Sequence, residues 1–243
     1  MLTLKEVLIE LKEKKSYELN LKELIVLTKE QIGEMISADF DQALACLEDG
    51  TMEAAFEAAD SEVAAALYQL KKDVGSPLNV VFHLQYILNP KLQFSYKDNV
   101  YRDIVTLGEK ILNGKAEKED IIEAMSSHLV SHYLKVKGLD KEDEARVNGV
   151  IYCENYLGYD KEVAYMLLGY YLCGRKFYRY QGRKFLTVAT LYDYLMAKHT
   201  FGRFSKGIGE NILFKAWLYY LGHNTIVEKW NDLVIELDEP VMY

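Results

Sequence analysis

The sequence predicts a mostly α-helical protein, organised as a multi-helix array with an internal duplication. Helix start and stop signals recur along the 243 residues, only three prolines interrupt them, and one long segment aligns with another 84 residues further on. Alternation of apolar and polar residues, which is typical of strands, is confined to two short stretches around 92–102 and 176–186. We therefore expect ten or eleven helices and two small hairpins.

The composition is typical of a globular protein, with 50% hydrophobic and 27% charged residues. The three cysteines (Cys46, Cys153 and Cys173) are odd in number and lack CxxC spacing, which predicts reduced thiols and no zinc framework. The N-terminal stretch MLTLKEVLIELKEKK is charged throughout, unlike a signal peptide, and the longest apolar run is too short to span a bilayer. These features predict a cytoplasmic protein without a membrane span.

The net charge of −8 is unevenly distributed along the chain. Ten acidic and no basic residues lie between Glu30 and Glu62, whereas residues 175–206 carry eight basic residues and one acid, Asp193. This separation indicates either an anionic partner for the basic region or docking of one region on the other. The sequence leaves both interpretations open.

Several helix starts are predicted from capping residues. Thr3 and Glu6 form a capping box, in which a side-chain hydroxyl and a carboxylate each satisfy a backbone N–H group. The same logic predicts helices that start at Asn20 with Glu23, at Thr28 with Gln31, at Asp39 and at Ser76 before Pro77.

Two nearly identical pairs of helix-ending and helix-starting residues occur in the middle of the chain. Gly138 with Asp140, and Gly158 with Asp160, each place a helix-ending glycine before an aspartate that caps the next helix. They predict helices near 141–157 and 161–173.

The duplication rests on a gap-free alignment of residues 84–138 with residues 168–222. Nine of about 55 positions are identical, and further pairs such as Ile104 with Val188 keep an apolar side chain. Each unit reads as helix, short β-hairpin, helix, loop, helix, and a weaker third copy is indicated near 19–50. Repeat arrays of this kind commonly form binding surfaces.

The predicted organisation has four parts. Residues 1–75 form an acidic N-terminal helical region, 76–140 the first repeat unit, 141–160 a connecting helix, and 161–243 the second repeat unit with a C-terminal tail. These parts form one compact domain or two intimate ones.

His128 and His132 have the i, i+4 spacing that zinc sites use on a helix. The metalloprotease glutamate is missing, no third ligand is evident, and the aligned residues Ile212 and Ala216 are apolar. We therefore expect packed or surface histidines, no metal and no cofactor.

The stretch SKGIGENIL (205–213) resembles a glycine-rich approach to a helix N-terminus, which can bind phosphate. Ile208 stands where a P-loop needs lysine. A flexible loop that leads into a helix is the preferred interpretation.

The basic region around RKFYRYQGRKF is the candidate binding patch. The aligned segment of the first repeat unit has the aromatic residues but lacks most of the positive charge. The aromatic residues are therefore expected to be structural, and only the basic side chains remain candidates for binding. The candidate residues are Arg175, Lys176, Arg179, Arg183, Lys184, Lys198, Arg203 and Lys206.

The acidic stretch 47–70 is predicted to form helices with a small-residue face packed inward and an acidic face in solvent. Docking of a basic partner, or of the chain's own basic region, on this face is the alternative.

No nucleophile with a placed histidine and no recognisable carboxylate pair occurs in the sequence. The leading hypothesis is a non-enzymatic helical scaffold or regulatory module that binds another protein. Binding of nucleic acid or another polyanion through 175–206 is the alternative, disfavoured by the net charge, and an enzyme with an unrecognised site ranks third.

Overall fold

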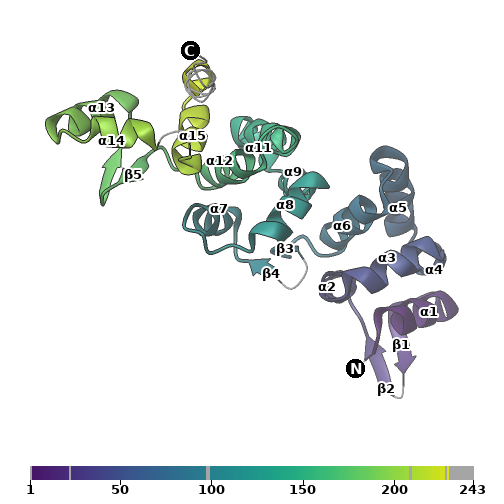
Figure 1. Cartoon of the computed structure of the whole chain (residues 1–243). Coiled ribbons are helices and arrows are strands. Elements are labelled where there is room, and N and C mark those ends of the chain that lie inside the picture. The colour runs from purple at the N-terminus through teal and green to yellow at the C-terminus, as the bar shows by residue number, and fades with distance from the viewer. Residues whose placement is uncertain (1, 22, 97–98, 208–209, 228, 230–243) are drawn as a thin grey trace, which may run out of the picture. The chain divides into compact units, whose positions relative to one another are not determined.

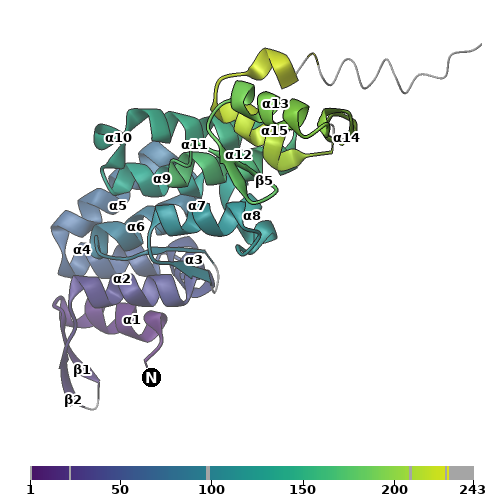
Figure 2. The ribbon, with the colours of Figure 1, turned by 90° about the vertical axis from the view of Figure 1, so that its left-hand side faces the viewer.

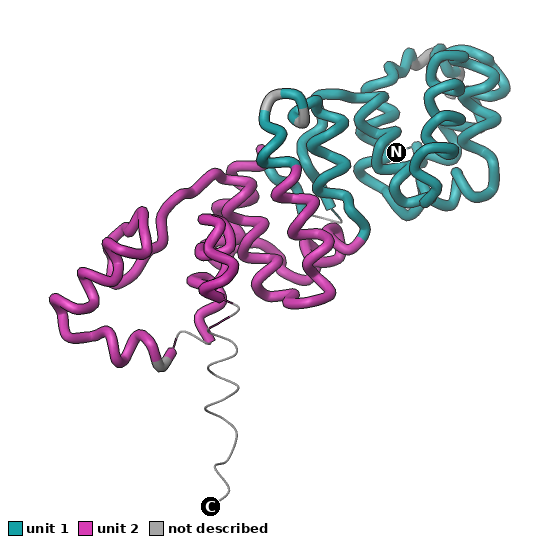
Figure 3. Tube along the Cα trace, turned by 90° about the horizontal axis from the view of Figure 1, so that it is seen from above, with its two compact units in different colours: residues 1–101, 127–147 teal, residues 102–126, 148–243 magenta. Residues whose placement is uncertain are grey.

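The computed structural model describes residues 2–21, 23–96, 99–207, 210–227 and 229, and it is mostly α-helical, as the sequence predicts. The described residues contain fifteen helices and three two-stranded antiparallel sheets (Figure 1). The chain divides into two compact units, one of residues 1–101 and 127–147 and the other of residues 102–126 and 148–243 (Figure 3). We call them unit 1 and unit 2.

Unit 1 contains the N-terminal helices and two of the hairpins. Its elements are α1 (Leu4–Lys14), β1 (Glu18–Leu21), β2 (Glu23–Val26), α2 (Lys29–Ala38), α3 (Phe40–Glu48), α4 (Thr51–Ala59), α5 (Ser61–Val74), α6 (Pro77–Leu88), β3 (Phe94–Tyr96), β4 (Asn99–Tyr101), α9 (Leu129–Val136) and α10 (Leu139–Glu142).

Unit 2 contains two helices from the middle of the chain and all the elements that follow α11. Its elements are α7 (Ile104–Leu112), α8 (Lys118–Ser126), α12 (Lys161–Cys173), β5 (Tyr178–Tyr180), β6 (Arg183–Phe185), α13 (Val188–Ala197), α14 (Phe201–Lys206) and α15 (Ile212–Tyr220). Helix α11 (Glu144–Tyr156) begins in unit 1 and ends in unit 2.

Most of the predicted caps are confirmed. Thr3 and Thr28 each form a reciprocal capping box, with Glu6 and Gln31 respectively. The side chains of the three aspartates at the starts of α3, α7 and α12 accept backbone N–H groups in the first turn of each helix. The described residues nevertheless contain more helices than the ten or eleven that were predicted, because short helices such as α10 and α14 were not anticipated.

The predicted helix start at Asn20 and Glu23 is wrong. Residues 18–21 and 23–26 pair as the antiparallel strands β1 and β2, with Glu18 opposite Val26, and the backbone N–H of Leu27 donates to the carbonyl of Tyr17 at 2.9 Å. Ile25 and Val26 are β-branched, which favours strand structure at the end of this stretch. Strand structure therefore occurs in three places and not in two.

The predicted cap at Asp140 is also wrong, because residues 139–142 form the short helix α10. The carboxylate of Asp143 accepts the backbone N–H of Arg146 at 3.0 Å, so Asp143 is the residue that caps α11.

The order helix, hairpin, helix occurs three times in the described residues, as α1–β1–β2–α2, α6–β3–β4–α7 and α12–β5–β6–α13. The second and third hairpins have the same register, with Phe94 opposite Tyr101 and Tyr178 opposite Phe185, at the 84-residue shift of the sequence alignment. The first set overlaps the region around 19–50 only as far as Ala38, where α2 ends. That the sets arose by duplication stays a prediction, as does the predicted division of the chain into four parts.

The sets are joined through close helix pairs. In unit 1, α2 lies between α1 and α6 (Figure 2), and a Cβ atom added at Gly33 of α2 would lie 2.9 Å from the carbonyl oxygen of Gln85 in α6. In unit 2, a Cβ atom added at Gly108 of α7 would lie 2.7 Å from the backbone nitrogen of Cys173 and 2.8 Å from the carbonyl oxygen of Gly169 in α12. Each pair therefore packs backbone against backbone, which only glycine allows.

None of the helices in the described part of the chain is both long enough and apolar enough to cross a bilayer.

Replacing Gly108 by alanine should destabilise the protein, because the new methyl group would meet backbone atoms that cannot rotate away. We expect Gly108→Ala to lower the free energy of unfolding by about 1–3 kcal/mol, as overpacking does, measured by chemical denaturation. Gly202→Ala is the matched control, because a Cβ atom there has no neighbour within 4 Å. The control should keep or slightly raise stability, and an equal loss in both variants would contradict the close-packing argument.

Candidate functional site: an apolar groove and a basic hairpin in unit 2

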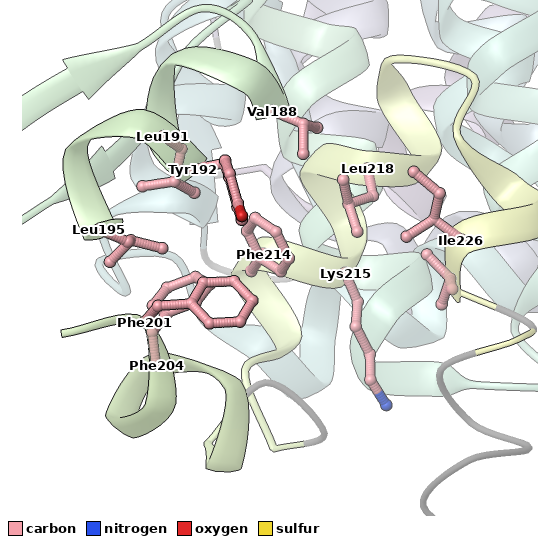
Figure 4. A pocket seen from close by; sticks show the side chains of 11 residues that line it. Val188, Leu191, Tyr192, Leu195, Phe201, Phe204, Phe214, Lys215, Leu218 and Ile226 are labelled. Carbon is pink, nitrogen blue, oxygen red and sulfur yellow. The ribbon is translucent and has the colours of Figure 1, made fainter. Parts of the chain in front are cut away.

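An apolar groove of about 220 Å³ lies between α13, α14, α15 and the residues after α15 (Figure 4). Its lining is apolar apart from the ends of Tyr192 and Lys215, and the Lys215 ammonium group points away from the apolar side chains in Figure 4. The lining residues are Val188, Leu191, Tyr192, Leu195, Phe201, Phe204, Phe214, Lys215, Leu218, Ile226 and Val227.

Aromatic contacts hold the walls of the groove. The ring of Tyr192 meets that of Phe201 edge-on at 5.3 Å between centroids, and Phe204 meets Phe214 at 5.2 Å. Behind Phe214 lies the fully buried Trp217, whose indole N–H donates to the carbonyl of Lys176 at 3.3 Å. The buried Trp217 and Phe214 belong to the core and form the base of the groove, whereas Tyr219 and Tyr220 of the same helix are half-buried.

The groove lies on the helix that corresponds to α2 and α7. Gly33, Gly108 and Tyr192 are each the fifth residue after the N-cap of their helix. Helices α6 and α12 pack on α2 and α7 at these glycines, whereas α13 packs mainly on α14 and β6 among the described residues. Tyr192 and Met196 are each 47% exposed as a result. The apolar surface that is covered in the first two sets is therefore open in the described part of the third.

The basic candidates separate into two groups. Three of them surround one aromatic ring, because Arg175, Arg179 and Lys184 lie 5.1, 5.8 and 4.5 Å from the centroid of Phe177. Arg183 lies 5.1 Å from the ring of Tyr194. The exposed Lys176 precedes β5 in the chain.

The other basic candidates lie on different elements. Lys198 follows α13, and Arg203 belongs to α14, where both side chains are exposed. Lys206 ends α14, and the description of the structure does not include its side chain. The predicted patch is therefore one cluster on the β5–β6 hairpin with further charges near the groove.

The hairpin places like charges directly opposite each other. Arg179 is the cross-strand partner of Lys184, whereas the neutral residues Ser95 and Val100 occupy the equivalent positions of the β3–β4 hairpin. Like charges in this position destabilise a strand pair. The pairing of Arg179 with Lys184 therefore does not stabilise the two strands, although both cations also lie against the Phe177 ring.

A shallow cavity of about 440 Å³ adjoins this cluster and is lined by Arg175, Arg179 and Lys184 together with Glu109. No ion pair joins these three cations to an acid within the described residues, although Glu109 offsets part of their field. The Nε atom of Arg175 is buried without a hydrogen-bond partner. Burial raises the pKa of the nearby Tyr170 hydroxyl to about 12, and the Arg175 guanidinium opposes this rise.

The two candidate histidines do not share a helix face. His128 is the left-handed N-cap residue of α9, with φ of 57°, and only His132 lies within the helix. Nδ1 of His132 instead lies 2.6 Å from Nε2 of His83 in α6, which the sequence analysis did not single out. Within the described residues, no group of three or more His, Cys, Asp or Glu side chains is placed to hold a metal ion.

The stretch SKGIGENIL divides between two helices, and residues 208–209 lie outside the described part of the chain. Ser205 and Lys206 end α14, and the side chain of Asn211 caps α15 by accepting the backbone N–H of Phe214. The predicted helix start is therefore confirmed, and phosphate binding there stays untested.

The acidic stretch 47–70 forms most of α4 and α5, which meet at Asp60. The Asp60 carboxylate accepts from the Tyr17 hydroxyl and pairs with Lys29, both at 2.7 Å, while Met52, Ala55 and other apolar side chains are buried. An apolar face is packed inward, but large side chains such as Phe56 and Leu67 form most of it and Ala65 is exposed, so the predicted small-residue face is not found. A docking role for the acidic face stays a prediction.

No protein-family model matches the chain, and comparisons with curated proteins and with solved structures also give no match.

The half-buried pair of His83 and His132 makes stability depend on pH. Burial, followed by the influence of His83, lowers the pKa of His132 to about 4, so the unfolded chain binds more protons than the folded chain between about pH 6.5 and 4. The free energy of unfolding should therefore fall as the pH drops through this window, by an amount on the order of 1–2 kcal/mol after allowance for solvent.

Denaturation at a series of pH values measures this effect as a difference between variants. His132→Gln should remove that part of the dependence, and His223→Gln, which changes an exposed histidine, should keep it. Identical pH profiles for the wild-type protein and His132→Gln would contradict the assignment.

Proposed function

We propose that this protein is a non-enzymatic helical scaffold or regulatory module that binds another protein through the surface of its repeated helix sets. The observation that supports this proposal is the apolar groove on α13, whose counterparts on α2 and α7 are each covered by a helix. A surface shaped to receive a helix, and open to solvent, matches the groove-binding mode by which many proteins hold a partner's amphipathic helix.

The apolar lining of the groove favours a protein partner with apolar side chains. A fully buried leucine or phenylalanine side chain contributes roughly 1.5–3 kcal/mol, and two or three such anchors from one helix give useful affinity. The half-exposed Tyr192 and the nearby Phe201, which is 36% exposed, are aromatic residues of the kind enriched at interfaces.

Crosslinking and co-purification from the native cell test this proposal with matched variants. Tyr192→Glu places a charge in the groove, whereas Leu186→Glu changes a residue that is 64% exposed and does not line the groove. We expect the same partner with the wild-type protein and with Leu186→Glu, and at least a tenfold loss with Tyr192→Glu. Recovery of the protein only as a lone monomer, or equal capture by all three proteins, would count against the proposal.

A second candidate function is the binding of single-stranded nucleic acid or another polyanion at the β5–β6 hairpin. It is supported by Arg175, Arg179 and Lys184, which converge on Phe177. Cations neutralise phosphates, and an accessible ring can stack on a base.

Fluorescence anisotropy with short single-stranded RNA and DNA at low salt measures this second function. Replacing Arg179 by serine and Lys184 by valine gives the hairpin the neutral pair found at the same register in β3–β4. If the cluster binds phosphates, the double variant should bind at least tenfold more weakly, and Lys161→Ser, an exposed change elsewhere in unit 2, should bind normally. Absence of binding at micromolar protein would end this hypothesis.

A further inference from the structure

The groove on α13 raises the question of what covers it in the free protein. Its wall includes Ile226 and Val227, and Val227 is only 2% exposed. The chain therefore leaves the described structure from the groove itself, two residues before Lys229 and three before Trp230. At about 1.5 Å per residue in a helix or about 3.4 Å when extended, Trp230 lies within reach of the groove in either conformation.

The sequence beyond this point is suited to an apolar groove. Trp230, Leu233, Val234 and Leu237 recur at intervals of three and four residues, which is the spacing of one face of a helix. Residues 230–243 also carry four acidic and no basic side chains.

The charges around the groove are complementary to this segment. Lys215 lines the groove, and the exposed Lys198 and Arg203 follow α13 and lie on α14, the two helices that form one side of it. None of the three makes an ion pair with an acid in the described part of the chain. An acidic amphipathic segment would pair its carboxylates with these cations while its apolar side fills the groove.

The first helix of a second copy is a poorer occupant. The exposed side of α1 carries Lys5, Glu6, Lys12 and Glu13 around Ile9, and burying these charges against aromatic walls would be costly. Docking of this helix in the groove of a second copy is therefore disfavoured.

We propose that the C-terminal segment 230–243 of this chain occupies the α13–α15 groove, with Trp230 and Leu233 as its apolar anchors. The docking itself is independent of the proposed function. Its regulatory consequence rests on that function, because an external helix then binds only to the fraction of molecules whose groove is open, and its apparent affinity falls in proportion.

Tryptophan fluorescence of the full-length chain tests the docking directly. The chain has two tryptophans, and Trp217 is fully buried, so the difference spectrum between the wild-type protein and Trp230→Phe reports Trp230 alone. We expect this difference emission to be blue-shifted and at least threefold less quenched by neutral acrylamide than that of a peptide of residues 230–243.

Two substitutions decide whether the groove provides the shielding. Each is introduced both with Trp230 and with Phe at position 230, so that a difference spectrum is obtained for each background. Tyr192→Glu should return Trp230 to the quenching of the free peptide, whereas Leu186→Glu, exposed but outside the groove, should leave it shielded. A Trp230 as accessible as the peptide in the wild-type protein, or equally shielded in both variants, overturns the proposal. Circular dichroism verifies that each variant keeps its helices.

The same proteins separate this inference from the proposed function. A partner captured by the wild-type protein and lost on Tyr192→Glu, with Trp230 exposed throughout, would support the external helix and refute the C-terminal segment. A shielded Trp230 that Tyr192→Glu exposes, with no partner captured by any variant, would support the segment and refute the protein-binding function.

Discussion

The close contact between α7 and α12 is the constraint on which the rest of unit 2 depends. Gly108 and Gly169 remove the side chains that would hold the two helices apart, so each backbone packs on the other. Interiors are packed to crystal-like density, and a contact of this kind has almost no freedom to shift. It fixes α12, and α12 in turn supports α15 and the aromatic base of the groove. Gly33 establishes the same arrangement between α2 and α6 in unit 1.

Most of the fold was predictable because its signals are local. A capping residue acts within one helical turn, so Thr3, Thr28 and Asp160 identify helix starts without knowledge of the rest of the molecule. The hairpin at 18–26 was not predicted, because Asn20 and Glu23 imitate a capping box. Only the pairing of Glu18 with Val26 reveals the strands, and pairing is a property of two segments together.

The candidate site was predictable only in part. The sequence identifies the basic residues, but it does not show that Arg175, Arg179 and Lys184 share one ring while Lys198 lies elsewhere. The partnership of His83 with His132 joins residues 49 positions apart, and no local spacing reports it. One feature of the sequence does indicate the groove. Position 192 is a tyrosine, whereas the equivalent positions of α2 and α7 are glycines.

In the proposed function, the basic β5–β6 hairpin and the apolar groove of unit 2 would contribute in different ways to the binding of one ligand. Exposed cations act over a Debye length of about 8–10 Å and mainly increase the rate of encounter with an anionic segment. The apolar groove acts only on contact, and its burial determines how slowly the segment leaves. An acidic amphipathic helix satisfies both surfaces, whereas a nucleic acid satisfies only the first. The net charge of −8 opposes extended polyanions more than short segments with a few carboxylates. Under the proposed function, the groove would therefore select a protein ligand, and the basic hairpin would extend the distance over which an acidic segment is attracted.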